Sequence, residues 1–250
     1  MRKRNYSMVC VIGLMMFLGL SSHGLQAAES PQGQKAQQQQ SASVGVEIST
    51  EELIQILKTG NIPVIDVRPP KEYDVSHIPG SVNIFETEID QMMNLCRDAS
   101  SGVVLYCNGP YCGKTVRVAE RLSQKGCANI KKYQHGLPVW RAFGNIAETH
   151  LPGFKYIFLS DKTAVFVDAR SKEEYAAGSV PGAVNLAGRD IEDANQDGRL
   201  PYTDHGTRII VFGKTISQAR ELAEAIAHRA YWNSSYLSAI YQDLKQARLW

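Results

Sequence analysis

The sequence predicts an α/β protein made of two similar domains, each with a mainly parallel sheet flanked by helices. The chain has 250 residues, enough for two domains of about 100 residues each. The segment 64–84, VIDVRPPKEYDVSHIPGSVNI, returns at 166–186 as FVDARSKEEYAAGSVPGAVNL. Between 66–83 and 168–185, eight of 18 residues are identical at a constant offset of 102. In both copies, short apolar runs alternate with helical patterns, which favours a parallel sheet.

The first 28 residues have the pattern of a secretory signal peptide. A basic start at 2–4 precedes an apolar run at 9–20 and a small, polar stretch that ends at Ala28. An uncleaved membrane anchor is the alternative. Residues 29–43 are Gln-rich and too polar to bury a core, so we expect a flexible linker. The expected mature protein is periplasmic or secreted, has no stable membrane insertion, and occupies a compartment that permits disulfides.

The elements of each copy follow from local patterns. In the first copy, 63–66 and 103–106 are apolar, β-rich runs typical of buried strands, and 115–125 has helical spacing. The second copy repeats this order, with expected strands at 164–168 and 209–212 and a helix at 217–228. Pro152 and Gly153 interrupt the pattern between the copies. We therefore predict domains at 44–150 and 151–250, with the boundary near Leu151.

Composition excludes several classes of protein. A formal net charge of +2 with 21% charged residues argues against a nucleic-acid partner. Five cysteines in a chain of this length do not make a disulfide scaffold. The two GKT triplets lack the preceding glycine of a phosphate-binding loop, because Asn108 and Arg208 stand at that position.

Three ordered motifs in the first copy resemble rhodanese (sulfurtransferase) domains. These are DVRPPKEYDVSHIPGSVNI, VVLYCNGPYC and HGLPVW, spread over residues 46–147. The second copy carries the first motif and the strand-helix pattern. The resemblance implies a tandem rhodanese. In this family, the cysteine at the end of the second apolar strand accepts a sulfane sulfur as a persulfide, which assigns Cys107 as the catalytic nucleophile.

The residues around Cys107 suit an anionic sulfur. Cys107 stands where a strand gives way to a helix, so loop amides and the helix N-terminus favour a thiolate. Further along, Lys114 and Arg117 could attract an anionic donor such as thiosulfate, or be solvated helix charges. Thr115 could cap the helix or face the site. The expected substrate-binding residues are the members of this loop and first helical turn: Asn108, Gly109, Tyr111, Cys112, Gly113, Lys114 and Arg117.

The loop departs from the commonest short rhodanese loop, because it holds a second cysteine and is about two residues longer. Cys112 could resolve a persulfide, pair with Cys107 in a disulfide, or simply pack. Two alternatives to sulfur transfer therefore stay open: a thiol–disulfide or redox-sensing protein that uses both cysteines, and a non-catalytic sulfur-carrier module. A related cysteine phosphatase is disfavoured because no arginine closes the loop.

The remaining polar residues carry weaker expectations. Asp66, Arg68, Glu72 and His77 are interpreted as mainly structural, as in the family, and a catalytic role for His77 is the alternative. No metal is predicted from the cysteines, because the spacing of Cys96, Cys107, Cys112 and Cys127 lacks paired C-x2-C motifs. No cofactor is expected. The expected partners are a small-molecule sulfur donor and a thiol or cyanide acceptor.

The second copy is predicted to be inactive. Gly213 takes the place of Cys107, the loop is about four residues shorter, and no cysteine follows Cys127. The segment 193–204, DANQDGRLPYTD, partly matches a calcium-binding loop. An Asp-Gly turn is the alternative interpretation.

Overall fold

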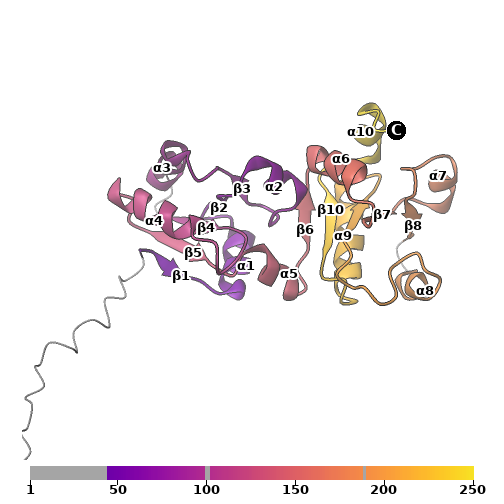
Figure 1. Ribbon diagram of the computed structural model, residues 1–250, viewed down its shortest axis with the longest axis horizontal. Coiled ribbons are helices and arrows are strands. Elements are labelled where there is room, and N and C mark those ends of the chain that lie inside the picture. Colours follow the sequence, from indigo (N-terminus) through magenta and orange to yellow (C-terminus); the bar gives the residue numbers. More distant parts are fainter. Residues whose placement is uncertain (1–43, 99–101, 188–189) are drawn as a thin grey trace, which may run out of the picture. The chain divides into compact units, whose positions relative to one another are not determined.

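The computed structural model describes residues 44–98, 102–187 and 190–250. The predicted signal peptide and the Gln-rich linker lie outside the described residues. Within them, ten strands and ten helices form two parallel five-stranded sheets with helices on both faces (Figure 1). This confirms the predicted fold class. None of the described helices is long and apolar enough to cross a bilayer.

The first sheet has the strand order β1-β5-β4-β2-β3, and all of its pairs are parallel. Its strands are β1 (Val46–Glu47), β2 (Val64–Asp66), β3 (Val82–Asn83), β4 (Val103–Tyr106) and β5 (Ile130–Tyr133). β4 matches the predicted run, and β2 begins one residue later. β4 lies in the centre of the sheet, so the loop that follows it opens at the middle of the carboxyl edge, where α/β folds place their sites.

The helices of this sheet are α1 (Thr50–Thr59), α2 (Pro70–Val75), α3 (Ile89–Asp98), α4 (Lys114–Gln124) and α5 (Gly136–Ala142). α1 shows why its sequence is helical. Ser49 caps its start by accepting a hydrogen bond from the amide of Glu52, and Gly60 ends it in a left-handed conformation with φ 63°. α4 begins and ends one residue before the predicted helix.

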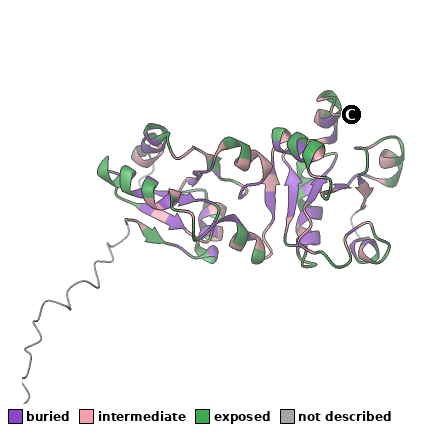
Figure 2. Cartoon of the chain, viewed as in Figure 1, coloured by how far each residue is buried: buried purple, intermediate pink, exposed green. Residues whose placement is uncertain are grey.

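The core on either side of the sheet follows from strand alternation. Val103 and Leu105 pack with α3 and α4, whereas Val104 and Tyr106 face α1 and α5. All four side chains are fully buried. Figure 2 shows the result: the central strands are buried, and the outer helix faces are exposed. A continuous apolar run therefore belongs in a parallel strand that is covered on both faces.

The second sheet repeats the order of the first as β6-β10-β9-β7-β8. Its strands are β6 (Ala147–Thr149), β7 (Val165–Asp168), β8 (Val184–Asn185), β9 (Ile209–Phe212) and β10 (Ser234–Leu237). β6 belongs to this sheet by pairing with β10. The second sheet thus begins at Ala147, a few residues before the boundary predicted near Leu151, because the Pro-Gly signal lies in the following helix.

The helices of the second sheet are α6 (Leu151–Ser160), α7 (Lys172–Ala176), α8 (Ile191–Gln196), α9 (Ile216–Ala227) and α10 (Tyr241–Gln246). α8 and α9 cover one face of the sheet, and α6 and α10 cover the other. α9 begins and ends one residue before the predicted helix.

β6 and α6 contact the loop of the first repeat that follows α2. His77 and Glu148 form an isolated antiparallel bridge, with N–O distances of 3.0 and 2.9 Å. The amide of His150 donates to the carbonyl of Asp74 at 2.9 Å. Gly153 in α6 lies so close to α2 that a Cβ there would stand 2.0 Å from the Asp74 carbonyl oxygen. Only glycine permits that approach.

The calcium loop considered for 193–204 does not form. Asp193 lies within α8, Asp197 hydrogen-bonds to Arg199, and Asp204 accepts bonds from Gly206 and Thr207. Gly198 has φ 83°, as an Asp-Gly turn requires. The acidic side chains stabilise local turns instead of converging on one point.

Candidate active site

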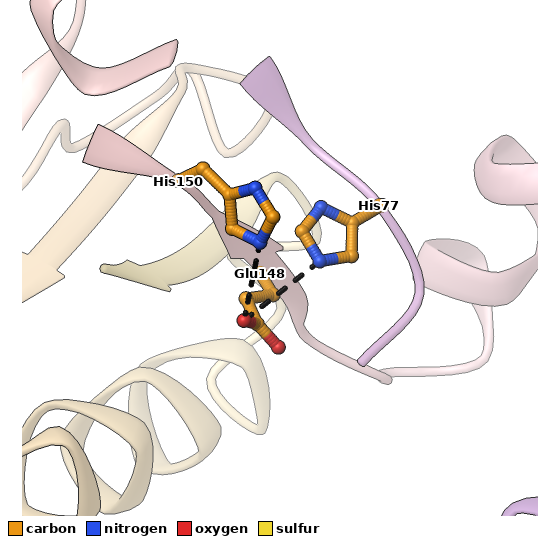
Figure 3. Close-up of side chains that lie close together, drawn as sticks. All are labelled: His77, Glu148 and His150. Carbon is orange, nitrogen blue, oxygen red and sulfur yellow. Dashed lines mark ion pairs between the residues drawn. The ribbon is translucent and has the colours of Figure 1, made fainter. Parts of the chain in front are cut away.

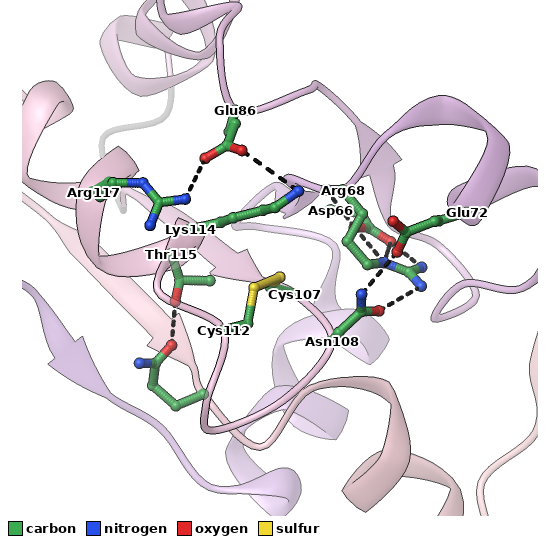
Figure 4. Close-up of a disulfide and its surroundings, with 11 residues drawn as sticks. Asp66, Arg68, Glu72, Glu86, Cys107, Asn108, Cys112, Lys114, Thr115 and Arg117 are labelled. Carbon is green, nitrogen blue, oxygen red and sulfur yellow. Dashed lines mark hydrogen bonds and ion pairs between the residues drawn. A yellow bond between two sulfur atoms is a disulfide. The ribbon is translucent and has the colours of Figure 1, made fainter.

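Cys107 directly follows β4, and its residue is almost completely buried. It forms a disulfide with Cys112, with a Cα–Cα distance of 6.4 Å (Figure 4). The structure therefore brings together the two cysteines of the predicted loop. This pairing is one of the alternatives left open for Cys112 by the sequence.

The loop backbone between β4 and α4 has unused donors. The amide of Cys112 donates to the carbonyl of Gly109 at 2.9 Å, which closes a turn. The amides of Asn108, Gly109, Tyr111 and Gly113 donate to none of the residues that the structure describes. α4 then begins without a side-chain cap. Free amides beside a helix N-terminus form a concave site that favours an anion.

Gly136 allows a neighbouring segment to support this loop. Its φ is 61°, and a Cβ there would lie 2.4 Å from the Cys107 carbonyl oxygen and 2.5 Å from the Gly109 nitrogen. The start of α5 therefore packs directly on the cysteine loop. This explains why the HGLPVW motif accompanies the cysteine motif, since a side chain at this position would displace the loop.

The two cations predicted to bind a donor are engaged by a carboxylate. Arg117 Nη2 lies 2.9 Å and Lys114 Nζ 3.4 Å from the oxygens of Glu86 (Figure 4). Burial alone would raise the pKa of Glu86, but the two cations outweigh it and lower that pKa. The charges of Lys114 and Arg117 are thus partly neutralised at the site. Thr115 does not cap α4: its hydroxyl hydrogen-bonds to Gln134.

Asn108 connects the loop to the first sequence motif. Its side-chain nitrogen donates to Glu72 at 2.8 Å, and its side-chain oxygen accepts from Arg68 Nη1 at 3.1 Å. Both side-chain groups of Asn108 are therefore engaged in positioning the loop. Tyr111, by contrast, is fully exposed at the tip of the loop.

The buried Asp66–Arg68 pair anchors this network. Arg68 Nε lies 2.9 and 3.0 Å from the two Asp66 oxygens, and Nη2 also donates to the Ser76 carbonyl at 2.7 Å. Burial alone would lower the pKa of Arg68, but its bonds to Asp66 raise it. Bidentate geometry compensates both buried charges. The predicted structural role of these residues agrees with these contacts.

A cavity of about 710 Å³ lies beside Asn108. Its lining includes three arginines, Arg68, Arg141 and Arg208. Arg208 pairs with Asp161 at 3.2 Å, whereas Arg141 has no carboxylate partner among the described residues. Arg141 Nε is buried without a hydrogen-bond partner in the described part of the chain. Burial, with Arg208 and Arg68 nearby, lowers the pKa of Arg141 to about 9. An anion in the cavity would compensate this charge.

A second disulfide joins Cys96 in α3 to Cys127 after α4, across 31 residues of sequence. The sequence showed no motif around either cysteine and left both unassigned. The disulfide joins α3 to the residues that follow α4, and it packs in the core between these helices and the first sheet.

The second repeat has no nucleophile at the corresponding place. Gly213 follows β9, and α9 begins after three residues, 213–215, compared with seven residues, 107–113, in the first repeat. The Gln218 side chain occupies this place, and its Oε1 accepts from the Lys214 amide at 2.9 Å. These observations agree with the shorter loop that the sequence indicated.

A cluster of three titratable side chains lies apart from the cysteine loop. His77, Glu148 and His150 converge where β6 meets the first repeat (Figure 3). The Nε2 atoms of His77 and His150 lie 3.8 and 3.7 Å from Glu148 Oε1. His77 is fully buried, and burial lowers its pKa to about 4.

Sequence reasoning missed Arg141 and this cluster. The cluster left a partial signal, since Glu148 and His150 have the i, i+2 spacing that places two side chains on one strand face. The sequence-based prediction about metals concerns only the cysteines and does not extend to this histidine and carboxylate pattern. Arg141 left no signal, because an arginine near the end of a helix is ordinarily solvated.

The chain matches the rhodanese-like domain family twice, over residues 49–143 and 158–247. A transcriptional regulator of the HTH type from Mycobacterium tuberculosis, Rv0324, is 34% identical over 98 residues, which are 39% of this chain and 42% of the regulator. The uncharacterized protein YqhL from Bacillus subtilis is 34% identical over 77 residues, or 31% of this chain and 59% of that protein. The chain therefore spans roughly half the length of these curated relatives.

Among solved structures, a thiosulfate sulfurtransferase from Pseudomonas aeruginosa aligns with a TM-score of 0.37 and 18% identity. The alignment covers 80% of this chain and 44% of that one. The two matched regions together span most of the described residues, and they hold β2 to β5 of the first sheet and β7 to β10 of the second. The chain belongs to the rhodanese-like domain family and carries that domain in two tandem copies.

Proposed function

We propose that this protein is a sulfurtransferase that carries a sulfane sulfur on Cys107. The observation that supports it is the placement of Cys107: a cysteine at the carboxyl end of the central strand, in a loop with unused amides that leads into a helix N-terminus. In the first step the Cys107 thiolate attacks the outer sulfur of thiosulfate. The S–S bond of thiosulfate breaks, sulfite leaves with the bonding electrons, and a Cys107 persulfide anion remains.

In the second step a thiophilic acceptor attacks the outer sulfur of the persulfide. With cyanide, the products are thiocyanate and the Cys107 thiolate, so charge and sulfur balance. The free loop amides would stabilise the anionic sulfur in both states. Fixed dipoles of this kind need no reorganisation during the reaction.

The cavity beside Asn108 supports an anionic donor. Three arginines line it, and the Nε atom of the half-buried Arg141 is buried there without a hydrogen-bond partner among the described residues. Thiosulfate is a dianion with oxygens that accept guanidinium hydrogen bonds. We therefore propose that Arg141 supplies the donor-binding charge expected of Lys114 and Arg117, which pair with Glu86.

The Cys107–Cys112 disulfide favours a second candidate, a thiol–disulfide function. The two functions can share one cycle. The Cys112 thiol attacks Cys107 Sγ of the persulfide, hydrosulfide leaves, and the disulfide forms. An external thiol must then reduce the disulfide before another sulfur can be accepted. An oxidising compartment, as proposed from the N-terminal segment, would preserve the disulfide.

The test is the intact mass of the reduced full chain after exposure to thiosulfate, with Cys107→Ser and Cys112→Ser alongside. We expect Cys112→Ser to gain one sulfur atom and keep it, and Cys107→Ser to gain none. The wild type should gain sulfur transiently and release sulfide as its disulfide forms.

Absence of sulfur gain in both the wild type and Cys112→Ser, with thiosulfate, mercaptopyruvate and polysulfide as donors, would contradict sulfur transfer. If the disulfide then still forms and exchanges with dithiols, the thiol–disulfide function alone stands. Sulfur gain in Cys107→Ser would place the persulfide on another cysteine.

A further inference from the structure

We propose that His77, Glu148 and His150 bind a divalent transition-metal ion, such as Zn²⁺, where β6 meets the first repeat (Figure 3). One ligand atom from each side chain lies within 4.8 Å of the other two. The two imidazole Nε2 atoms lie 3.8 and 3.7 Å from Glu148 Oε1. An ion about 2.0–2.2 Å from each ligand fits between atoms at these separations.

Hydrogen bonds fix the tautomers of both histidines. His77 Nδ1 lies 2.8 Å from the Tyr73 carbonyl oxygen, and His150 Nδ1 lies 3.0 Å from an Asp74 carboxylate oxygen. Both partners only accept, so each Nδ1 carries the proton. In a neutral ring, this leaves a lone pair on each Nε2. A carbonyl or carboxylate behind a histidine is the usual outer-shell partner of a metal ligand.

The Glu148 carboxylate is also held in position by a hydrogen bond. The Tyr236 hydroxyl donates to Glu148 Oε2 at 2.7 Å, which leaves Oε1 directed at the two rings. In each of the three side chains, the polar atom that faces away from the cluster is therefore hydrogen-bonded, and the other polar atom faces the two neighbouring ligands.

The inner atoms are three acceptors that face one another. Two imidazole lone pairs and a carboxylate oxygen repel unless a cation lies among them. Neither Nε2–Oε1 separation is short enough for a direct hydrogen bond. The Tyr73 ring stacks on His77 with centroids 3.7 Å apart, which holds that ring in place and supplies no charge. A metal cation satisfies all three acceptors at once.

The backbone holds the ligands before any ion arrives. The two hydrogen bonds of the His77–Glu148 bridge set these residues side by side. The amide of His150 is tied to the Asp74 carbonyl, the residue whose side chain also orients the His150 ring. Preorganisation of this kind reduces the entropy lost when an ion binds.

The donor set selects the class of metal. Imidazole suits Zn²⁺, Fe²⁺, Ni²⁺ and Cu²⁺, whereas Ca²⁺ and Mg²⁺ prefer all-oxygen sites. Three protein ligands leave a position open for water. The His150 side chain is 35% exposed, so an ion can enter from solvent on that side. The site joins the His77 loop of the first repeat to β6 of the second sheet.

The test is Zn²⁺ titration of the oxidised full chain carrying Cys10→Ser, in which the two disulfides keep the other four thiols from binding metal. After removal of metal with EDTA, Zn²⁺ is added in competition with a chromogenic chelator, and Co²⁺ reports geometry by its visible spectrum. We expect one equivalent to bind and to raise the melting temperature. Asp74→Asn should weaken binding by about 10–100-fold, as for other outer-shell partners.

The ligand variants are His150→Ala and Glu148→Gln, both at partly exposed positions, with His228→Ala as the matched surface control. We expect both ligand variants to lose the tight equivalent and the Co²⁺ spectrum while circular dichroism stays native, and His228→Ala to behave as wild type. A wild type that binds no tighter than His150→Ala would overturn the proposal. Equal binding by all variants would do the same. A Cys107→Ser and Cys112→Ser double variant that lost the Zn²⁺ would place it on the thiols instead.

Discussion

The two repeats share their supporting hydrogen bonds almost atom for atom but differ at the loop that follows the central strand. Arg68 binds Asp66 and the carbonyl eight residues ahead of it, and Arg170 does the same in the second repeat. The Tyr73 hydroxyl donates to the Ser81 carbonyl, and the Tyr175 hydroxyl donates to the Ala183 carbonyl. The Asn83 side-chain amide donates to the carbonyls of Asp66 and Arg68. The Asn185 side-chain amide donates in the same way to the carbonyls of Asp168 and Arg170.

The divergence begins directly after the central strand. Asn108 bonds to Glu72 in the first repeat, and Lys214 pairs with Glu174 at 3.1 Å in the second. The Gln218 side chain closes the short second loop by accepting from an amide and donating to the Ala169 carbonyl at 2.8 Å. The comparison teaches that the repeated motif supports the sheet edge, whereas the length of one loop decides whether a nucleophile has amides around it.

Placing a cysteine in the second repeat tests the role of loop length and has the largest expected effect. We expect Gly213→Cys in a Cys107→Ser background to take up no sulfur, with transfer on the order of a thousandfold or more below wild type. The reason is that Gln218 Oε1 lies 2.8 Å from the position of the new Cβ, and the loop has no spare residues. Sulfur-transfer rates and intact mass measure it. Gly213→Ala with Cys107 intact is the control, and sulfur on the new thiol would refute the role of loop length.

Removing the Cys96–Cys127 disulfide tests how far a cross-link that the second repeat lacks stabilises the first repeat. The cross-link closes 31 residues in the first repeat, and no cysteine follows Cys127. Loop-closure entropy predicts a loss of about 3–4 kcal/mol in the free energy of unfolding for Cys96→Ala with Cys127→Ala. Denaturant unfolding measures it under oxidising conditions. Cys112→Ser breaks the shorter cross-link and should cost less. Equal losses would show that chain entropy is not the cause.

Asp66→Asn and Asp168→Asn compare the two shared networks directly. Each change leaves a buried arginine without its counter-charge, so we expect each to cost about 3 kcal/mol. Asp66→Asn should in addition lower kcat/KM on the order of tenfold, because Arg68 also holds Asn108 in the cysteine loop. Asp168→Asn should leave kcat/KM near wild type. Denaturation and steady-state kinetics measure the two effects, and an equal loss of turnover would show that stability alone is responsible.

The arginines of the cavity give the smallest expected effect. Arg141 has no carboxylate partner among the described residues, whereas Arg208 of the second repeat pairs with Asp161. We expect Arg141→Gln to raise KM for thiosulfate about tenfold with kcat nearly unchanged, since uniform binding is lost. Arg208→Gln should have a weaker effect. Steady-state kinetics at several donor concentrations separate these outcomes. A fall in kcat alone would remove Arg141 from donor binding.

The fold could be predicted from the sequence because its signals are local. An apolar β-rich run such as 103–106 identifies a strand buried on both faces, and helical spacing identifies α4 and α9 to within one residue. The repeat at a constant offset identified two domains of one kind. The position of Cys107 between a strand and a helix was equally local. Predicting these features requires only the spacing of apolar residues along the sequence and the chemistry of adjacent residues.

The rest of the site depended on contacts between distant residues, which a single sequence does not encode by spacing. Glu86 partly neutralises Lys114 and Arg117 from another segment, which is why we propose Arg141 instead for the donor-binding charge. Cys96 meets Cys127 only because α3 and α4 pack on one face of the sheet.

The sequence by itself determined the two-domain architecture, the position of Cys107 at the end of a strand and the absence of a cysteine at that position in the second repeat, because burial period and turn chemistry act over a few residues. Only the tertiary structure decided which charges face the cavity and which cysteines pair. It also decided that His77 meets Glu148 and His150, since the packing of β6 brings together residues far apart in the chain.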